Sequence, residues 1–427
     1  MTQPLALGID VGTSGVRAAL LSETGAVCAL AAARMDEIGA DLRAPQVWEG
    51  TLALALSRLD PALKAEIGAL SVDATSGTVV ALDARHTPLG TALLYNDAVD
   101  DLAIPEAIAA LAPRQSAAHG ASSGLARALA LSRRPGCALV LHQADWIASR
   151  LGAPVGVSDE SNALKTGYDP VARAWPEWIA ALPLSDVALP EVVPAGQPTG
   201  QVSADAAARH ALPEGAVIVA GMTDGCASFL ATGAAHPGEG VSALGTTLTL
   251  KLLSDKPLFA PEYGLYSHRI GDLWLAGGAS NSGGAALAVH FAPEVIADLC
   301  RNIDPTTDSG LDYYPLPRPG ERFPVNDPAL PPRLEPRPAE EALFLKGLLE
   351  GIARIEALGY ARLAELGAPA LTRLRSVGGG AQNTVWTALR ARLIQAEMVE
   401  AASTEAAVGV ARAARAHLDG QPLGLRA

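Results

Sequence analysis

The sequence predicts an α/β protein built from two similar halves, and three observations lead to this prediction. Short apolar runs bounded by glycine alternate with segments whose apolar residues recur every three or four positions. A strand, a Gly-Thr turn and a second strand at residues 5–22 return at residues 241–254, ending in Leu-Ser both times. The length of 427 residues suits two or three domains rather than one.

The first half begins with two strands joined by a glycine-containing turn. Residues 46–59 follow with apolar residues at helical spacing behind a proline, which predicts a helix. Two strands then flank a Ser-Gly turn. In order, we expect strands at 5–10 and 16–21, a helix at 46–59, strands at 68–75 and 78–83, helices near 104–112, 123–132, 142–150 and 203–211, a strand at 216–222 and a helix at 227–234.

The segment 235–240 holds a proline and two glycines, and we place the domain boundary there, giving domains at 1–235 and 236–427. Residues 303–338 are rich in proline, so we expect them to follow the surface with little regular structure. The other elements predicted for this half are strands at 241–244, 248–253 and 374–377 and helices at 339–366, 383–395 and 404–417.

Composition excludes several classes of function. Lys and Arg number 32 against 45 Asp and Glu, and the net charge of −13 is the wrong sign for binding nucleic acid or an anionic membrane. The four cysteines form no CxxC pair, which favours neither a zinc site nor a disulfide framework. With no apolar run of membrane-spanning length and no basic leader, we expect a cytoplasmic protein.

The first turn combines a carboxylate with small and hydroxyl residues. Gly12, Thr13 and Ser14 follow Asp10, and such a turn can cradle phosphate while the carboxylate holds Mg²⁺ through water. An ordinary hairpin uses the same residue types.

The second turn, at Gly245, Thr246 and Thr247, favours the phosphate interpretation. Two Gly-Thr hairpins that face each other can hold a polyphosphate from both sides. The chain has neither a GxxxxGK[ST] nor a GxGxxG motif, so a P-loop or dinucleotide site has no candidate.

Asp224 stands where the strand at 216–222 meets a helix. It is either an N-cap or a general base that takes a proton from a sugar hydroxyl during phosphoryl transfer. Its place shortly before the second Gly-Thr turn supports the base.

Residues 378–380 are three glycines between a strand and a helix, where a nucleotide can approach the backbone. Asn383 and Trp386 follow, and the tryptophan either lines a purine pocket or fills the core. Ser76 and Lys165 are candidate substrate contacts, although a turn serine and a surface lysine are common without a ligand.

Four stretches resemble the motifs of the FGGY family of carbohydrate kinases, in the family's order and over nearly the whole chain. They are residues 8–14 (first phosphate motif), 223–225 (catalytic aspartate), 242–247 (second phosphate motif) and 378–383 (adenosine motif). The resemblance implies an ATP-dependent kinase with Mg²⁺ and two ribonuclease-H-like, actin-like ATPase domains. It implies an active-site cleft between them, with sugar and phosphate on the N-terminal domain and nucleotide on the C-terminal one.

Within the family, residues 74–78, 94–96, 143–146, 162–165, 277–281 and 309–315 are similar to the short pentulose kinases, above all the D-ribulose kinases. The resemblance implies that Asp10 and Asp224 flank the reacting centre and, with Ser76, bind the sugar. It assigns the phosphates and the adenosine to Gly12, Thr13, Ser14, Gly245, Thr246, Thr247, Gly379, Gly380, Asn383 and Trp386.

We therefore expect a kinase that converts D-ribulose to D-ribulose 5-phosphate, with D-xylulose or another ketose or polyol as the alternative acceptor. An actin- or Hsp70-like ATPase that acts as an interaction protein is the alternative from another class. Asp224 separates the two, because an interaction protein has no sugar hydroxyl to deprotonate. The partners expected are thus a small sugar and ATP, and the sequence does not indicate an oligomeric state.

Overall fold

The computed structural model describes residues 3–183 and 187–423, which divide into two compact units. The first unit comprises Met1–Ala231, His268–Asp272 and Glu405–Ala427, and the second comprises Thr232–Ser267 and Leu273–Thr404. The chain thus leaves the first unit four residues before the predicted boundary at 235/236, returns to it briefly at His268–Asp272, and returns again at Glu405. The C-terminal segment, which we assigned to the second domain, belongs to the first unit.

The first unit is built on a sheet with the strand order β3-β2-β1-β4-β10-β9. Strands β1, β2 and β3 form an antiparallel meander, β4 and β10 run parallel to β1, and β9 is antiparallel to β10. The three parallel strands are apolar, as expected for strands buried on both faces. The strands are β1 (Leu5–Val11), β2 (Gly15–Leu21), β3 (Val27–Arg34), β4 (Ile67–Ala74), β9 (Pro198–Gln201) and β10 (Val217–Thr223).

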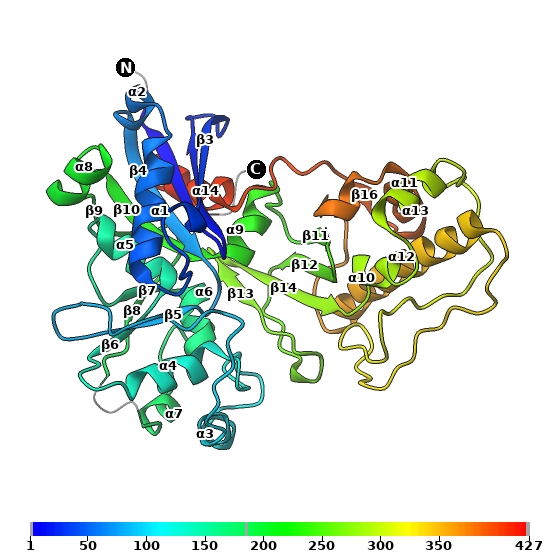
Figure 1. Ribbon diagram of the computed structural model, residues 1–427, viewed down its shortest axis with the longest axis horizontal. Helices are drawn as coiled ribbons and strands as arrows, with labels where there is room; N and C mark the ends of the chain where they lie inside the picture. Colours follow the sequence, from blue (N-terminus) through cyan, green and yellow to red (C-terminus); the bar gives the residue numbers. More distant parts are fainter. Residues whose placement is uncertain (1–2, 184–186, 424–427) are drawn as a thin grey trace. The chain divides into compact units, whose positions relative to one another are not determined.

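Helices cover both faces of this sheet. Alternate residues of β1, such as Leu7 and Ile9, join the core that contains Trp48 of α1 (Pro45–Ser57). The opposite face receives α14 (Ala406–Leu418), which Figure 1 shows in red beside β1 and α9 (Asp224–Ala231). A Cβ on Gly8 would lie 2.0 Å from the carbonyl oxygen of Ala407, so α14 packs this closely only because Gly8 has no side chain.

The remaining elements of the first unit lie beside this sheet. Strands β5 and β6 form a two-stranded antiparallel ladder, and β7 and β8 a parallel one. They are β5 (Val79–Leu82), β6 (Leu139–His142), β7 (Val157–Asp159), β8 (Glu191–Val193), β13 (His268–Ile270), α2 (Pro61–Lys64), α3 (Ala103–Leu111), α4 (Gly124–Ser132), α5 (Gln143–Leu151), α6 (Glu160–Ala163), α7 (Glu177–Ala180), α8 (Ala204–His210), and the 3₁₀ turns η1 (Met35–Glu37) and η2 (Leu164–Thr166).

The sheet of the second unit repeats the order of the first, as β14-β12-β11-β15-β16. Strands β11, β12 and β14 form the meander, and β15 and β16 continue parallel to β11. The predicted pair of similar halves is therefore confirmed. The strands are β11 (Glu239–Leu244), β12 (Leu248–Ser254), β14 (Leu273–Ser280), β15 (Arg373–Val377) and β16 (Glu397–Met398).

The third strand of each meander, β3 and β14, was missing from the predicted elements. Half of the residues of β3 are alanine and all but Ala33 are at least partly exposed, and β14 carries Gly277 and Gly278, so neither has the alternation that marks a strand. In the second unit, α12 packs against α11 and α13. Its helical segments are α10 (Gly284–Ala288), α11 (Pro293–Cys300), α12 (Glu341–Glu365), α13 (Thr384–Leu393), and the turns η3 (Pro261–Tyr263) and η4 (Gly379–Gln382).

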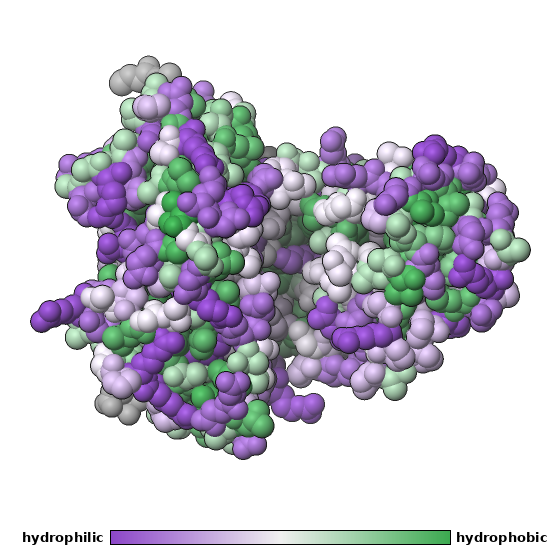
Figure 2. Space-filling view, viewed as in Figure 1, coloured by the Kyte–Doolittle hydropathy of each residue, from purple (hydrophilic) through white to green (hydrophobic). Residues whose placement is uncertain are grey.

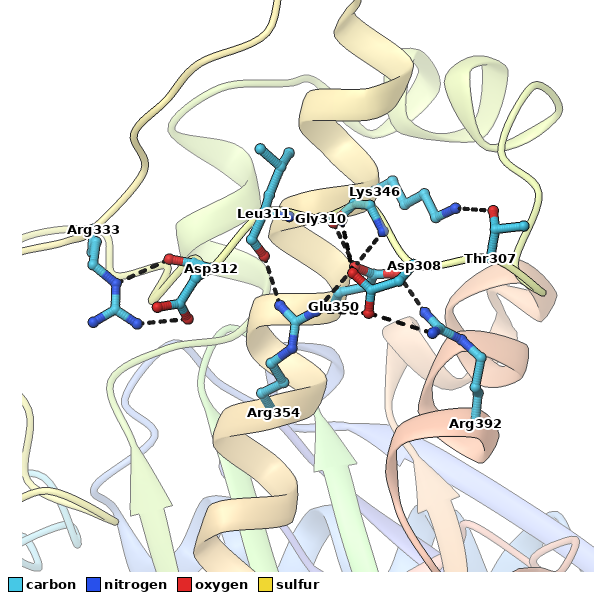
Figure 3. A network of polar contacts seen from close by, with 11 residues as sticks. Thr307, Asp308, Gly310, Leu311, Asp312, Arg333, Lys346, Glu350, Arg354 and Arg392 are labelled. Carbon is cyan, nitrogen blue, oxygen red and sulfur yellow. Dashed lines mark hydrogen bonds and ion pairs between the residues drawn. The ribbon is translucent and has the colours of Figure 1, made fainter.

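The proline-rich segment 303–338 contains no helix or extended strand, as predicted, and polar contacts fix it to α12 and α13. Figure 3 shows the centre of these contacts, the fully buried Glu350 of α12. It accepts hydrogen bonds from the backbone N–H and hydroxyl of Ser309 and forms ion pairs with Arg354 and Arg392. The segment also buries Phe323 completely, so it is part of the core.

The helices and the visible surface of the described residues can be compared with what a membrane-spanning segment requires. No helix there has the length and apolar character to span a bilayer. Figure 2 shows hydrophilic residues over much of the visible face, with hydrophobic residues in small groups between them. All four cysteines are free thiols.

Candidate functional site

The first predicted phosphate turn is the β1–β2 hairpin of the first unit. The N–H of Gly12 donates to the carbonyl of Gly15 over 3.0 Å, which closes the turn. Thr13 and Ser14 are exposed at its tip, whereas Asp10, at the end of β1, is only 5 % exposed. The hairpin therefore presents two hydroxyls to solvent beside a nearly buried carboxyl group.

Asp73, which the sequence analysis missed, lies beside Asp10. The two residues are partners in the register of β1 and β4, and Asp73 is completely buried. Among the described residues, only the carboxyl group of Asp10 serves as a side-chain hydrogen-bond partner for the carboxyl group of Asp73. A signal was available, since Asp73 ends a buried strand just before Ser76, as Asp10 ends one before Gly12.

Burial and mutual repulsion raise the pKa values of these carboxyl groups. Burial is the main cause of the raised pKa of Asp10, the hydrogen bond with Asp73 and the charge of Arg17 oppose it, and the charge of Asp224 adds to it. Burial again comes first for Asp73, whose pKa lies well above its usual range, with further contributions from Asp10 and Asp224. Three carboxyl groups of the first unit therefore share one electrostatic environment.

Asp10 fits the predicted role of holding Mg²⁺ through water. Among the residues that the structure describes, the half-exposed Arg17 is the one cation that pairs with Asp10, at 3.4 Å, and Arg17 also pairs with Glu405 at 3.4 Å. Mg²⁺ keeps several waters and needs one or two carboxylates besides the substrate phosphates. The described residues hold no group of three or more His, Cys, Asp or Glu that could bind a metal ion.

Asp224 is the first residue of α9 and is half-buried. Its Oδ1 accepts a hydrogen bond of 2.7 Å from the N–H of Gly225, and the positive end of a helix stabilises a carboxylate at this position. The N–H of Thr223 donates to the hydroxyl of Ser161 over 2.9 Å, which fixes the end of β10. The strand-to-helix junction thus holds the Asp224 backbone in place.

Ser76 occupies the turn after β4, and its hydroxyl is buried without a hydrogen-bond partner among the described residues. Lys165, in η2, is half-buried. A Cβ on Gly77 would lie 3.6 Å from the Cα of Gly124, and one on Gly124 would lie 2.7 Å from the carbonyl oxygen of Lys165. The start of α4 therefore connects the two predicted substrate-binding segments.

The second unit contains a cavity of about 910 Å³, large enough for a nucleotide. Six of the seven nucleotide-binding residues predicted for this unit line it, whereas Thr247 does not. Gly12, Thr13 and Ser14 belong to the first unit. The six are Gly245, Thr246, Gly379, Gly380, Asn383 and Trp386.

The three glycines after β15 have different surroundings. Gly378 has a φ of +86°, and a Cβ there would meet the carbonyl oxygen of Leu244 at 2.9 Å. A Cβ on Gly380 would lie 2.5 Å from the Trp386 ring, whereas one on Gly379 would meet no atom within 4 Å. Two glycines are thus required by packing, and Gly379 leaves open space at the cavity wall.

Asn383 and Trp386 join the cavity wall to α13. Asn383 caps the helix, since its Oδ1 accepts a 3.0 Å hydrogen bond from the N–H of Trp386. The Asn383 amide nitrogen points to the sulfur of Cys300 at 3.2 Å. Trp386 is 3 % exposed and belongs to the hydrophobic core as well as the cavity wall, and its contact with a purine stays a prediction.

The opposite wall of the cavity was not predicted. It includes Phe291, Ile296 and Cys300, from α11 and the segment before it. These are ordinary apolar residues without a motif, and sequence alone offers no signal that they face a cavity. The Gly245 turn itself rests on α10, because the carbonyl of Gly245 accepts a 2.9 Å hydrogen bond from Gly284.

Comparisons with known proteins agree with this architecture. Residues 240–418 match the model of the FGGY family of carbohydrate kinases, C-terminal domain. The xylulose kinase of Streptomyces coelicolor is 30% identical over 274 residues, and the match covers 59% of this chain and 55% of the relative. The match to the Klebsiella pneumoniae xylulose kinase, at 28% identity, covers 57% of that relative. The chain thus spans a little over half the length of these curated relatives.

Solved structures of kinases share the fold over nearly the whole chain. A structure described as a xyloylose kinase from Brucella ovis has a TM-score of 0.83 at 25% identity, over 99% of this chain and 94% of that one. The xylulose kinase of Rhodospirillum rubrum has a TM-score of 0.78 at 23% identity and shows the fold alone. The expected actin-like ATPase fold is confirmed, and the resemblance to the FGGY family of carbohydrate kinases is confirmed by the match of residues 240–418 to the family's C-terminal domain.

Proposed function

We propose that the protein is an ATP-dependent, Mg²⁺-requiring kinase that transfers the γ-phosphoryl group of ATP to a hydroxyl of a ketopentose. The observation that carries the proposal is the placement of Asp224. It is a half-buried carboxylate at the N-terminus of α9, in the electrostatic environment of Asp10. A sugar hydroxyl is a poor nucleophile, and a carboxylate at this position can act as its base.

In the proposed reaction, Asp224 accepts the proton of the acceptor hydroxyl. The bond from that oxygen to the γ-phosphorus forms while the bond between phosphorus and the β,γ-bridging oxygen breaks, and ADP leaves with that electron pair. The hydrogen bond from Gly225 stabilises the charged form of Asp224 before the reaction. Asp224 therefore enters the reaction as a base.

Asp10 is proposed to hold Mg²⁺ through water. Mg²⁺, when bound, supplies positive charge that stabilises the phosphoryl group in transfer. Thr13 and Ser14 present hydroxyls beside Asp10 for phosphate oxygens. In the second unit, the cavity is proposed to hold the adenosine, with Gly379 providing the open wall and Trp386 an apolar one.

Two acceptors have specific support. D-Ribulose is favoured by the likeness of the Ser76 turn and five other stretches to the D-ribulose kinases, as set out above. D-Xylulose is favoured by the relatives from Streptomyces coelicolor and Klebsiella pneumoniae, both of which are described as xylulose kinases. A gluconokinase of Bacillus subtilis also matches 93% of this chain at 22% identity, so gluconate belongs in any test of acceptors.

The test measures ADP release from purified protein with ATP and Mg²⁺, alone and with D-ribulose, D-xylulose, gluconate or glycerol. Release that depends on a ketopentose supports the proposal, and the larger kcat/KM identifies the acceptor. A higher kcat/KM with D-xylulose would reject D-ribulose as the physiological substrate. Release at full rate without any acceptor would instead favour the interaction ATPase, because such a protein needs no sugar.

A further inference from the structure

Arg127, in α4, is a buried arginine that joins three segments of the first unit. It is 2 % exposed. Its Nε donates to the carbonyl of Gly77 at 2.9 Å, and its Nη1 donates to the carbonyls of Asp97 at 2.9 Å and Ser122 at 2.7 Å. One guanidinium group thus holds the Ser76–Gly77 turn, the loop that ends at Asp97, and the approach to α4.

This cation has no carboxylate of its own among the described residues. The nearest candidate is Asp97, whose carboxylate is bound by both Nη atoms of Arg43 and accepts the N–H of Leu94 at 2.7 Å. Burial lowers the pKa of Arg127 to about 10, so the group is still charged at neutral pH. Arg127 therefore only shares the charge of Asp97 with Arg43. A buried charge whose counter-ion is bound by another group is costly for folding, and such groups cluster at functional sites.

The guanidinium lies directly against the Ser76–Gly77 turn. Gly77 has a φ of +82°, and a Cβ there would be 2.8 Å from the Nη2 of Arg127. The turn is also bonded to the loop before Asp97, because the N–H of Tyr95 donates to the hydroxyl of Thr78 at 3.0 Å. The turn and this loop are therefore held as one piece, with Arg127 beneath it.

We propose that Arg127 is a positioning residue for the acceptor, which fixes the Ser76 turn and the 94–97 loop and thereby decides between epimeric ketopentoses. This inference rests on the proposed function, in which Ser76 binds the sugar. D-Ribulose and D-xylulose differ only in the direction of one hydroxyl. Discrimination between them requires polar groups held in one place, because a group that shifts can bind either epimer.

The test compares two variants. Arg127→Met removes the charge and the three hydrogen bonds to backbone carbonyls, whereas Arg127→Lys keeps the charge but loses the planar guanidinium group that forms those three bonds. Arg134→Met is the matched control, since the Nη1 of Arg134 also donates to two backbone carbonyls, those of Leu89 and Thr91, away from the Ser76 turn. For each protein, KM and kcat are measured for D-ribulose, D-xylulose and ATP, together with the melting temperature.

We expect Arg127→Met to raise the KM of the preferred pentulose at least tenfold and to change the kcat/KM ratio of the two epimers at least fivefold. The KM of ATP stays within twofold, and Arg127→Lys recovers part of the loss. Arg134→Met lowers the melting temperature without changing the epimer ratio. An unchanged epimer ratio in folded Arg127→Met would overturn the inference and leave Arg127 a structural role. If Arg127→Met does not fold, an unchanged ratio in Arg127→Lys overturns it.

Failure of the proposed function gives a different result. A wild-type protein that phosphorylates gluconate or glycerol but no pentulose contradicts the ketopentose assignment. The Arg127 variants are then compared on that acceptor, where a KM increase confined to the acceptor supports the positioning role and equal KM values contradict it. A wild-type protein without any acceptor overturns both proposals.

Discussion

The two units share one sheet order but carry different chemistry at the same place. When Gly12-Thr13 is aligned with Gly245-Thr246, Ala243 stands where the first unit has Asp10. Asp10 is paired in register with Asp73, and Ala243 with Val377. A pair of buried carboxyl groups in one unit is therefore replaced by two apolar side chains in the other.

The segments that follow these strands also differ. After Asp73 come Ser76 and Gly77, with Arg127 beneath the turn, whereas after Val377 come three glycines and a cavity. The first unit thus offers charge and hydrogen bonds, which suits an acceptor and a phosphoryl group. The second offers space and an apolar wall, which suits a nucleoside. A shared topology fixes where a site lies, and the side chains decide what it does.

Of the substitutions that test this difference between the units, we expect the largest effect from one at Asp224, and the quantity affected is kcat. Asp224→Asn keeps the size of the side chain but cannot take a proton, so we expect kcat with the pentulose to fall by about 10²–10⁴. ATP and pentulose binding, measured by calorimetry, are retained.

Asp205 serves as the control for Asp224→Asn, because it too lies in the first turn of a helix, α8. Asp205→Asn leaves kcat unchanged. A folded Asp224→Asn protein with near wild-type kcat would leave Asp224 only its contacts at the start of α9.

A second experiment tests how much a buried ion pair of the second unit contributes to the unfolding free energy. Arg390 of α13 and Glu356 of α12 are both completely buried, joined by two hydrogen bonds of 2.6 Å. Arg390→Met leaves the carboxylate without its partner, and we expect a loss of about 3–5 kcal/mol in unfolding free energy. Denaturant titration measures it.

The double variant Arg390→Met with Glu356→Leu distinguishes a lost ion pair from poor packing. Removing both charges recovers much of the stability, because no buried charge remains. If the double variant is as unstable as Arg390→Met, the loss comes from packing around α13.

A buried histidine of the first unit makes the stability of the protein depend on pH. Burial lowers the pKa of His142 to about 3, so the folded protein keeps this side chain neutral. Below the ordinary pKa near 6.5, the unfolded chain binds a proton that the folded protein does not. Stability is therefore lost as the pH falls from 6.5 towards 3, by about 1.4 kcal/mol per pH unit.

Asp73 acts in the opposite direction, since a raised carboxyl pKa adds stability as the pH falls. The His142 contribution is therefore measured as the difference between wild type and His142→Gln in denaturant titrations at several pH values. A difference that stays constant between pH 7 and 4.5 would contradict it.

Gly379 and Gly380 form a matched pair for the second unit. Gly380→Ala drives a methyl group into the Trp386 ring, and we expect it to lower stability by about 1–3 kcal/mol. Gly379→Ala meets no atom, so it leaves stability nearly unchanged and weakens nucleotide binding by narrowing the cavity. Thermal melts measure the effect on stability, and nucleotide titrations measure the effect on binding. Equal melting temperatures would show that the Trp386 ring can move aside.

The smallest effect expected is at Ser76 in the first unit. Ser76→Ala removes one hydrogen bond to the acceptor and raises the pentulose KM about tenfold, which corresponds to ~1.4 kcal/mol. The KM of ATP is the internal control and stays constant. An unchanged pentulose KM would remove Ser76 from the acceptor site.

The class of fold, the repeat and the position of the motifs could all be predicted from the amino-acid sequence alone. Local signals suffice for these features, because apolar periodicity and turn residues are set by neighbours along the chain. Asp10, Asp224 and the glycines at 378–380 were found in this way. β3 was not, because its partly exposed alanines form a strand only through pairing with β2.

Tertiary structure alone decided which distant residues meet. Asp73 lies beside Asp10 because the two residues are in register on neighbouring strands. Helix α14 packs against β1 in the first unit because Gly8 has no side chain that would collide with it. Arg127, Phe291 and Cys300 belong to no motif, and the segments that they contact or face lie far from them along the chain. Burial, charge repulsion and close packing depend on distances in space, and these distances are fixed only when the sheets and helices have assembled.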